Sequence, residues 1–146
     1  MKVGIGCDHN AFHLKEQVKQ HLESQGHTVE DVGCYSIDAI DYPGVALKVT
    51  DYILSDRVER GILLCGTGIG MAMAANKVKG IRAAQVHDVY SAQRACLSNN
   101  AHIITIGSHI VGLNLAKMLV DEFLAQQFVP TGSARKIEQL MDIERS

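Results

Sequence analysis

The 146-residue sequence lacks an excess of one charge and lacks any long apolar run. Lysine and arginine number 14 and aspartate and glutamate 16, so the net charge of −2 excludes the basic field that attracts nucleic acids and anionic membranes. No apolar run approaches the roughly 20 residues that span a bilayer. The amino-terminal strand-like run soon meets Asp8 and His9, unlike a signal peptide. We therefore expect a cytoplasmic protein without a nucleic-acid or membrane partner.

Closely spaced cysteine pairs are also missing. The four cysteines, Cys7, Cys34, Cys65 and Cys96, lie 27, 31 and 31 residues apart, and none belongs to a C-x-x-C pair. This spacing resembles neither a zinc site nor the disulfide framework of a small secreted protein. We expect reduced thiols and no metal, with most of the cysteines packed as small apolar side chains.

Linkers, internal repeats and low-complexity tracts are absent, and short apolar segments instead alternate with amphipathic ones. The predicted strands are residues 2–7, 27–32, 60–64, 81–87 and 101–107. The predicted helices are residues 11–25, 42–54, 71–77, 88–98, 111–126 and 133–143. Such alternation implies a parallel sheet covered on both faces. We therefore predict one doubly wound α/β domain over residues 1–146, with five parallel strands.

The last predicted helix stands apart from this pattern. It follows a break at residues 128–132, and an apolar stripe runs along it, formed by Ile137, Leu140, Met141 and Ile143. This stripe covers either its own domain or a second subunit, and the sequence favours neither alternative.

The stretch of residues 61–77 carries the strongest chemical signal. A buried strand ends at Leu64, Cys65 follows it, and a loop with three glycines, Gly66, Gly68 and Gly70, leads into a helix rich in alanine and methionine. The N–H groups of such a loop, together with the positive end of the helix, bind an anion such as a phosphate or an enediolate. The same field favours the thiolate of Cys65. A base beside an anion hole is the minimal equipment for moving a proton next to a carbonyl.

Other polar residues follow the predicted strands. Asp8 and His9 follow the first, His87 and Asp88 end the fourth, and residues 107–109 end the fifth. Because the carboxyl ends of parallel strands share one edge of the sheet, we expect these residues to gather near the thiol-bearing loop. For Asp88, the alternative is a structural role as a helix N-cap.

A dinucleotide-binding module is an alternative from another class, since Gly66-x-Gly68 follows a strand and precedes a helix. Met71 occupies the third glycine position, however, and the motif lies in the middle of the chain rather than on a first βα turn. Too little chain then remains for a separate catalytic domain. These features count against the alternative.

Seven short blocks resemble a known family. They are Gly6-Cys-Asp-His9, Asp41-Tyr-Pro43, Cys65-Gly-Thr-Gly-Ile-Gly70, Ala74-Ala-Asn-Lys77, Gly80-Ile-Arg-Ala83, Tyr90-Ser-Ala-Gln93 and Val111-Gly-Leu113. Together they resemble ribose-5-phosphate isomerase B, whose family includes the galactose-6-phosphate isomerase subunits. The resemblance implies a Rossmann-like fold and a homodimer or dimer of dimers with active sites between subunits. It also implies cofactor-free aldose–ketose interconversion of a sugar phosphate.

Candidate site residues follow from this resemblance, position by position. Cys65 corresponds to the cysteine that transfers a proton between C1 and C2, and Met71 and its neighbours offer no carboxylate, so the chain resembles the cysteine branch. Thr67 is the second catalytic candidate, with a loop or capping role as its alternative. The candidates for binding the substrate are Asp8, His9, Tyr42, Gly66, Gly68, Ile69, Gly70, Asn99, His109 and Lys136. For Tyr42, packing at a helix start is an equal alternative.

Several positions depart from the family pattern. Ser98 stands where the family has the histidine that opens a furanose ring. His109, Gly132 and Lys136 replace three phosphate-binding arginines, with Arg135 displaced beside them. Because lysine cannot reproduce the bidentate fork of arginine, the resemblance implies an altered phosphate site.

The missing histidine bears on the substrate. A tetrose with phosphate on O4 cannot close a furanose ring and needs no ring opener, and residues 95–105 also resemble a branch that acts on erythrulose 4-phosphate. Ribose 5-phosphate stays an alternative if water, Ser98 or His102 assists ring opening, although a hydrogen-bonded core histidine is the simpler prediction for His102. A non-catalytic sugar-phosphate-binding subunit or sensor is the remaining alternative.

Overall fold

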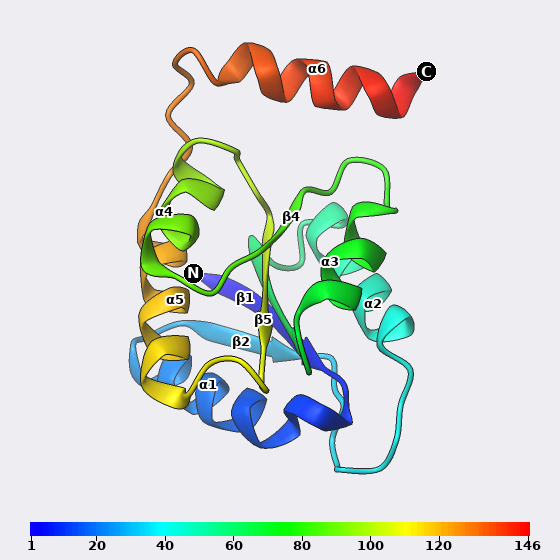
Figure 1. The fold of residues 1–146 in the computed structure, drawn as a ribbon, viewed down its shortest axis with the longest axis vertical. Helices are drawn as coiled ribbons and strands as arrows, with labels where there is room; N and C mark the ends of the chain where they lie inside the picture. The colour runs from blue at the N-terminus through cyan, green and yellow to red at the C-terminus, as the bar shows by residue number, and fades with distance from the viewer.

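A computed structural model describes all residues from Met1 to Ser146 and places five parallel strands in one sheet between two layers of helices (Figure 1). The strands are β1 (Lys2–Cys7), β2 (Thr28–Asp31), β3 (Arg60–Cys65), β4 (Ala83–Gln85) and β5 (Ile103–Gly107). The helices are η1 (His9–Ala11), α1 (Phe12–Ser24), α2 (Tyr42–Leu54), α3 (Ile69–Asn76), α4 (Val89–Leu97), α5 (Leu113–Ala125) and α6 (Ala134–Arg145). None of these helices combines the length and the apolar character needed to cross a membrane.

The strand order β2-β1-β3-β5-β4 aligns the carboxyl ends of the central strands. Cys7 is paired with Leu64, and Cys65 with Gly107, so β1, β3 and β5 end at the same level. The chain builds outward from β1 toward β2 and then crosses to β3 on the other side, which makes the β1/β3 junction the point where the winding direction reverses. Ligands of doubly wound folds bind at such a junction, beyond the carboxyl ends of the strands.

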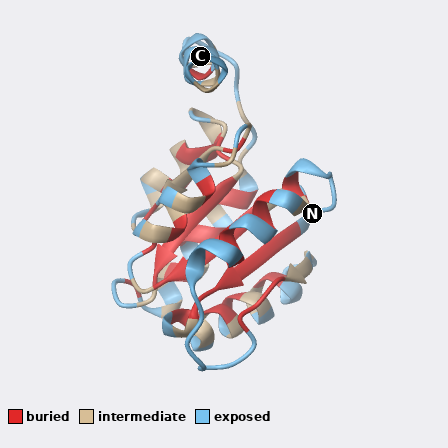
Figure 2. Cartoon of the chain, turned by 90° about the vertical axis from the view of Figure 1, so that its right-hand side faces the viewer, coloured by how far each residue is buried: buried red, intermediate tan, exposed pale blue.

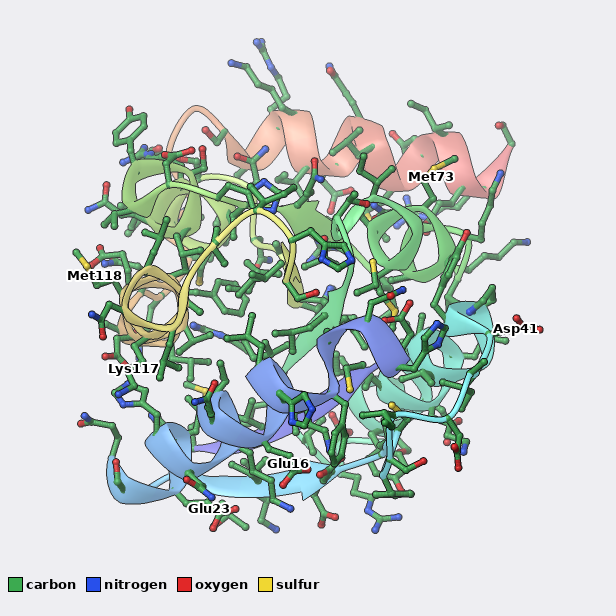
Figure 3. The ribbon with its side chains drawn as sticks, turned by 60° about the horizontal axis from the view of Figure 1, so that its bottom comes forward. Glu16, Glu23, Asp41, Met73, Lys117 and Met118 are labelled. Carbon is green, nitrogen blue, oxygen red and sulfur yellow. The ribbon has the colours of Figure 1, made fainter.

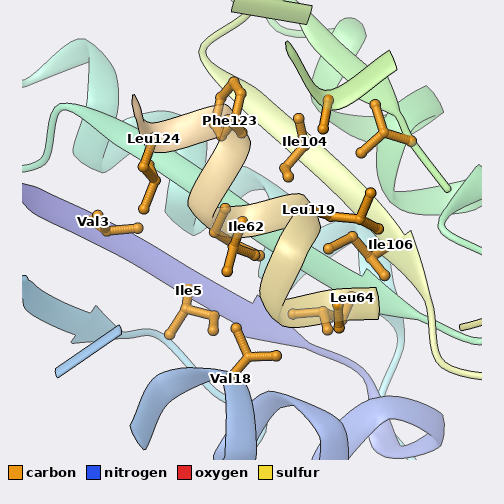
Figure 4. Close-up of a cluster of buried hydrophobic side chains, with 14 of the residues drawn as sticks. Val3, Ile5, Val18, Ile62, Leu64, Ile104, Ile106, Leu119, Phe123 and Leu124 are labelled. Atoms are coloured by element: carbon orange, nitrogen blue, oxygen red, sulfur yellow. The ribbon is translucent and has the colours of Figure 1, made fainter. Parts of the chain in front are cut away.

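Each face of the sheet is buried under its own helices. Alternate strand residues, among them Ile5, Leu64 and Ile106, pack in a cluster of 22 buried residues with α1, α4 and α5 (Figure 4). Leu63, Ile103 and their neighbours pack in a second cluster of 12 buried residues with α2 and α3. Figure 2 shows the sheet as a buried layer with exposed residues on the outer sides of the helices. The predicted doubly wound parallel sheet is therefore confirmed.

Several element boundaries differ from the sequence prediction by one or two residues, and two of these elements bear on the site. The fourth strand covers only β4, because Ile81 N–H bonds the carbonyl of Val78 in a turn before the strand begins. The third helix begins two residues early, at Ile69, because Gly68 adopts a left-handed conformation with φ of 77° and serves as its N-cap. The early start brings the positive end of α3 closer to Cys65.

One buried ion pair was not predicted. Lys15, on α1, is fully buried, and its Nζ lies 2.7 Å from Asp31 at the end of β2 and 2.7 Å from Glu16. Burial raises the pKa of Asp31, but the hydrogen bonds from Lys15 and from Gly33 outweigh it and lower the pKa overall. The helical spacing of α1 gave no signal that a lysine would face the core.

Helix α6 crosses the amino-terminal edge of the sheet (Figure 1). Its Glu144 carboxylate accepts a hydrogen bond from Gly80 N–H at 2.9 Å, and its Met141 Sδ lies 3.2 Å from the Arg82 guanidinium. Leu140 and Ile143 remain 48% and 69% exposed. Part of the apolar stripe thus contacts its own domain, and packing of the exposed part on a second subunit stays a prediction.

His102 is hydrogen-bonded as expected, but it is half-buried and lies just before β5 rather than in the core. It also makes stability depend on pH. Its Nδ1 accepts a hydrogen bond from Arg82 N–H at 3.1 Å, and burial, with the nearby Arg82 charge, lowers its pKa from 6.5 to about 4. The unfolded chain therefore takes up a proton more readily than the folded one. We expect the free energy of unfolding to fall by about 3 kcal/mol from this residue as pH drops from about 7 to about 4.

The measurement is denaturant unfolding across this pH range for the wild type and for His102→Asn. The asparagine oxygen can still accept the Arg82 hydrogen bond but does not titrate. The difference in unfolding free energy between the two proteins should therefore shrink as pH falls. A difference that stays constant over the range would contradict the prediction.

Candidate active site

Cys65 lies at the end of β3, where the loop toward α3 begins. The residue is only 4% exposed, and its Sγ accepts a hydrogen bond from the backbone N–H of Gly68 at 3.1 Å. A donor aimed at sulfur stabilises the thiolate more than the thiol, and the amino terminus of α3 adds partial positive charge at the same place. The predicted arrangement of thiol, glycine loop and helix start is thus formed within one chain, and anion binding by this loop stays a prediction.

Two aromatic side chains pack directly on this loop. A side chain at Gly70 would collide with the ring of Tyr42, the first residue of α2, and a Cβ at Gly66 would lie 2.9 Å from Cδ2 of His109. The backbone N–H of His109 also donates to the Gly66 carbonyl at 3.0 Å. Glycine at these two positions therefore lets Tyr42 and His109 approach the loop.

Asp8 and His9 lie beside the same edge, at the end of β1. Asp8 is 5% exposed; its Oδ1 accepts a hydrogen bond from Asn10 N–H at 3.0 Å, and its backbone N–H donates to the Leu64 carbonyl at 3.1 Å. His9 Nδ1 accepts a hydrogen bond from Ile40 N–H at 3.1 Å, which leaves Nε2 as the donor of a neutral ring. The structure thus brings Asp8, His9, Tyr42, residues 65–70 and His109 to one edge.

This edge is turned toward the reader in Figure 3. Asp41, which precedes α2, and Met73, on α3, lie on one side of the view, and Lys117 and Met118, on α5, lie on the other.

Asp88 is the N-cap of α4, because its Oδ1 accepts a hydrogen bond from Ser91 N–H at 2.7 Å, so the structural alternative for this residue holds. The hydrogen bonds from Ser91 also lower the pKa of Asp88.

The loop is supported by residues that the sequence did not single out. Thr105 is fully buried in β5, and its Oγ1 donates to the Gly68 carbonyl at 2.7 Å. Gln85, at the end of β4, donates from Nε2 to the Thr67 carbonyl at 2.8 Å. Thr67 Oγ1 in turn accepts Ile69 N–H at 3.2 Å at the start of α3. A lone threonine among apolar residues of a strand was a usable signal for Thr105, whereas nothing marked Gln85.

Asn99 and Lys136 are not brought to Cys65 within one chain. Asn99 follows α4, which returns the chain to the amino-terminal edge of the sheet before β5 begins. Lys136 lies on α6, which packs beside Gly80 and Arg82, ahead of β4. Asn99 also lines a cavity of about 370 Å³ along the outer side of β4 and α4. Both residues are exposed at this opposite edge.

Ser98, at the position of the family's ring-opening histidine, is turned inward. Its Oγ is buried and has no hydrogen-bond partner. His102 is the other candidate for the acid that opens a sugar ring. Its Nδ1 accepts a hydrogen bond from Arg82 N–H, and burial lowers its pKa to about 4. Neither side chain is therefore arranged as an acid that donates a proton to a ring oxygen near neutral pH.

The doubly wound sheet and the thiol held in a glycine loop at its carboxyl edge define an α/β protein with a cysteine-centred candidate active site. The family model described as Ribose/Galactose Isomerase matches residues 3–140. The chain therefore belongs to the ribose/galactose isomerase family, and the resemblance stated from the sequence is confirmed.

Individual relatives match over nearly the whole chain. Ribose-5-P isomerase B of Listeria innocua is 42% identical over 145 residues, which cover 99% of this chain and 98% of the relative. D-erythrulose-4-phosphate isomerase of Pectobacterium atrosepticum is 46% identical over 144 residues, covering 96% and 93%. The solved structure of Clostridium thermocellum ribose-5-phosphate isomerase B superposes with a TM-score of 0.97 at 39% identity, covering 99% of this chain and 98% of that one.

Proposed function

We propose that this protein interconverts an aldose phosphate and a ketose phosphate with Cys65 as the base. The thiolate takes the proton from C2 of the aldose to give an enediolate, the hydroxyl proton of O2 passes to O1, and the same sulfur returns its proton to C1. The carbon skeleton rearranges internally, so no external oxidant or reductant is needed. The observation that carries the proposal is the hydrogen bond of 3.1 Å from Gly68 N–H to Cys65 Sγ, in a loop that opens α3. Thr67 and the amides of Gly66 and Gly70 would hold the enediolate oxygens, because the Gly68 N–H is directed at Cys65 Sγ and the Ile69 N–H at Thr67 Oγ1.

The surrounding side chains supply contacts for the rest of the substrate. In this proposal Asp8 binds sugar hydroxyls, Tyr42 closes one side of the sugar, and His9 and His109 donate hydrogen bonds to the phosphate. Their support is their common position at the edge that holds Cys65. An imidazole lacks the bidentate fork with which arginine holds a phosphate, so this phosphate site differs from an arginine-based one.

We further propose that Asn99 and Lys136 enter this site from a second subunit of a homodimer or dimer of dimers. Both lie at the edge of the sheet opposite Cys65, so they can meet a substrate only at the site of another copy. The exposed Leu140 and Ile143 of α6 offer an apolar face that a second subunit would cover.

For the substrate, we propose an erythrose 4-phosphate/erythrulose 4-phosphate pair. The buried Ser98 Oγ and the neutral His102 leave ring opening without an acid, and a tetrose 4-phosphate has no furanose to open. With initial rates, kcat/KM for erythrose 4-phosphate is expected to exceed that for ribose 5-phosphate by about 100-fold. Ribulose 5-phosphate, which is open-chain, serves as the control and should carry no such penalty. Equal or higher kcat/KM for ribose 5-phosphate would contradict the tetrose assignment.

A non-catalytic sugar-phosphate-binding subunit or sensor is the alternative, because the family's histidine and arginines are replaced at Ser98, His109 and Lys136. NMR in deuterated water separates the two functions. An isomerase incorporates solvent deuterium at C1 or C2 of the sugar phosphate, whereas a sensor binds the same ligand without exchange. Binding by calorimetry with no exchange for erythrose 4-phosphate or ribose 5-phosphate would reject the proposed activity.

A further inference from the structure

Two consecutive peptide units of the thiol-bearing loop are held from outside the loop. The Thr67 carbonyl accepts a hydrogen bond of 2.8 Å from Gln85 Nε2, and the Gly68 carbonyl accepts one of 2.7 Å from Thr105 Oγ1. Gln85 lies on β4, at the edge of the sheet, and Thr105 on the neighbouring β5. Each of these side chains donates its hydrogen bond to a backbone carbonyl of the loop and none to the sulfur of Cys65.

The hydrogen bond from Gln85 affects the sulfur of Cys65 through a single rigid peptide unit, the one between Thr67 and Gly68. The Thr67 carbonyl and the Gly68 N–H belong to the same planar trans peptide and point in opposite directions, so fixing the oxygen fixes the direction of the N–H. That N–H is the donor to Cys65 Sγ. From this geometry we infer that Gln85 is a positioning residue: it aims the Gly68 N–H at the Cys65 thiolate. The inference rests on the proposed role of Cys65 as the base.

The other contacts of the loop leave this task to Gln85. Thr105 holds the next peptide unit, whose N–H, that of Ile69, bonds Thr67 Oγ1 instead of the sulfur. Gly107 lies against the backbone of Thr67, where an added Cβ would be 2.8 Å from its Cα. Thr105 and Gly107 therefore keep the loop seated on β5, and the tilt of the peptide between Thr67 and Gly68 depends on the Gln85 amide.

Gln85→Met tests the inference, because it keeps the length of the side chain and removes its donor. Gln17→Met, on the exposed side of α1, is the matched control. Thiolate formation is followed by ultraviolet absorbance against pH, with Cys65→Ala subtracted to isolate the one sulfur. We expect the pH midpoint of thiolate formation to rise in Gln85→Met and kcat near pH 7 to fall about tenfold, with recovery at higher pH. Gln17→Met should match the wild type in both.

The outcomes separate the inference from the proposed function. If Gln85→Met leaves the midpoint unchanged, or lowers kcat equally at every pH, Gln85 does not position the donor. Should Gln85→Met fail to fold by thermal melting, Gln85→Leu, which is also uncharged and lacks the donor, must show the raised midpoint. Full exchange activity in Cys65→Ala would instead reject the proposed base, whatever the Gln85 variants do.

Discussion

Cys65→Ala is expected to lower kcat by about 10³-fold while KM changes by less than about threefold. The sulfur is the proposed carrier of the proton, so its loss removes a group that acts in the transition state rather than in ground-state binding. Alanine leaves the loop amides, and hence the anion contacts, in place. The measurements are initial rates and deuterium incorporation at C1 and C2 of the sugar phosphate.

Cys96→Ala provides the control for this experiment. Cys96 is also a buried free thiol, on α4, and its Sγ contacts the carbonyl of Gln126 at 3.4 Å, away from the thiol-bearing loop. Its replacement should leave kcat close to that of the wild type, at a modest cost in stability. Wild-type turnover in Cys65→Ala, or an equal loss in both variants, would argue against a specific role for Cys65.

Mixing two inactive variants is expected to restore about a quarter of the wild-type activity if each site is shared by two subunits. One variant is Cys65→Ala, and the other combines Asn99→Ala with Lys136→Ala, which removes two polar contacts and should cost about 100-fold or more on its own. In a mixed dimer both lesions fall in one site and leave the other intact. Half of the dimers are mixed, and half of the sites in each are active.

A second mixture controls for effects of mixing itself. Cys65→Ala and Thr67→Ala alter the same loop, so every site of a mixed dimer keeps one lesion and activity should not return. The subunits are exchanged by joint refolding or by co-expression with two different tags, and the mixed species is then isolated and assayed. Failure of the first mixture to exceed its inactive parents would exclude a site that combines Cys65 with Asn99 and Lys136 of another copy.

The fold was largely predictable because its signals are local and repeated. Short apolar strands such as β3 and β5 alternate with amphipathic helices, which indicates a parallel sheet with two covered faces. The errors have two causes, a contact between residues distant in the sequence and the conformation of a single glycine. Lys15 can be buried because its Nζ donates a hydrogen bond to the carboxylate of Asp31 on β2, and Asp31 lies 16 residues away in the sequence. The early start of α3 depends on the conformation of Gly68.

The site was predictable only in part. Parallel strands of matched length bring Asp8, Cys65 and His109 to one edge, so the order of elements along the chain is enough to gather them. The support from Gln85 was not predictable, since it depends on how far β4 extends beside β5 and on a side chain reaching a backbone carbonyl. Asn99 and Lys136 were assigned by resemblance alone, and their role stays a prediction.

The burial of all four thiols has a practical consequence for chemical intervention. Burial raises the pKa of Cys7 and of Cys96, which makes both poor nucleophiles, and the Sγ of Cys34 is occupied by contacts with Cys7 and the Ser36 carbonyl. Only Cys65 lies in the loop that we propose to bind an anion. A small electrophile that carries a phosphate would therefore be guided to this one sulfur, and a covalent inhibitor of the protein is better designed as a reactive mimic of the substrate than as a general thiol reagent.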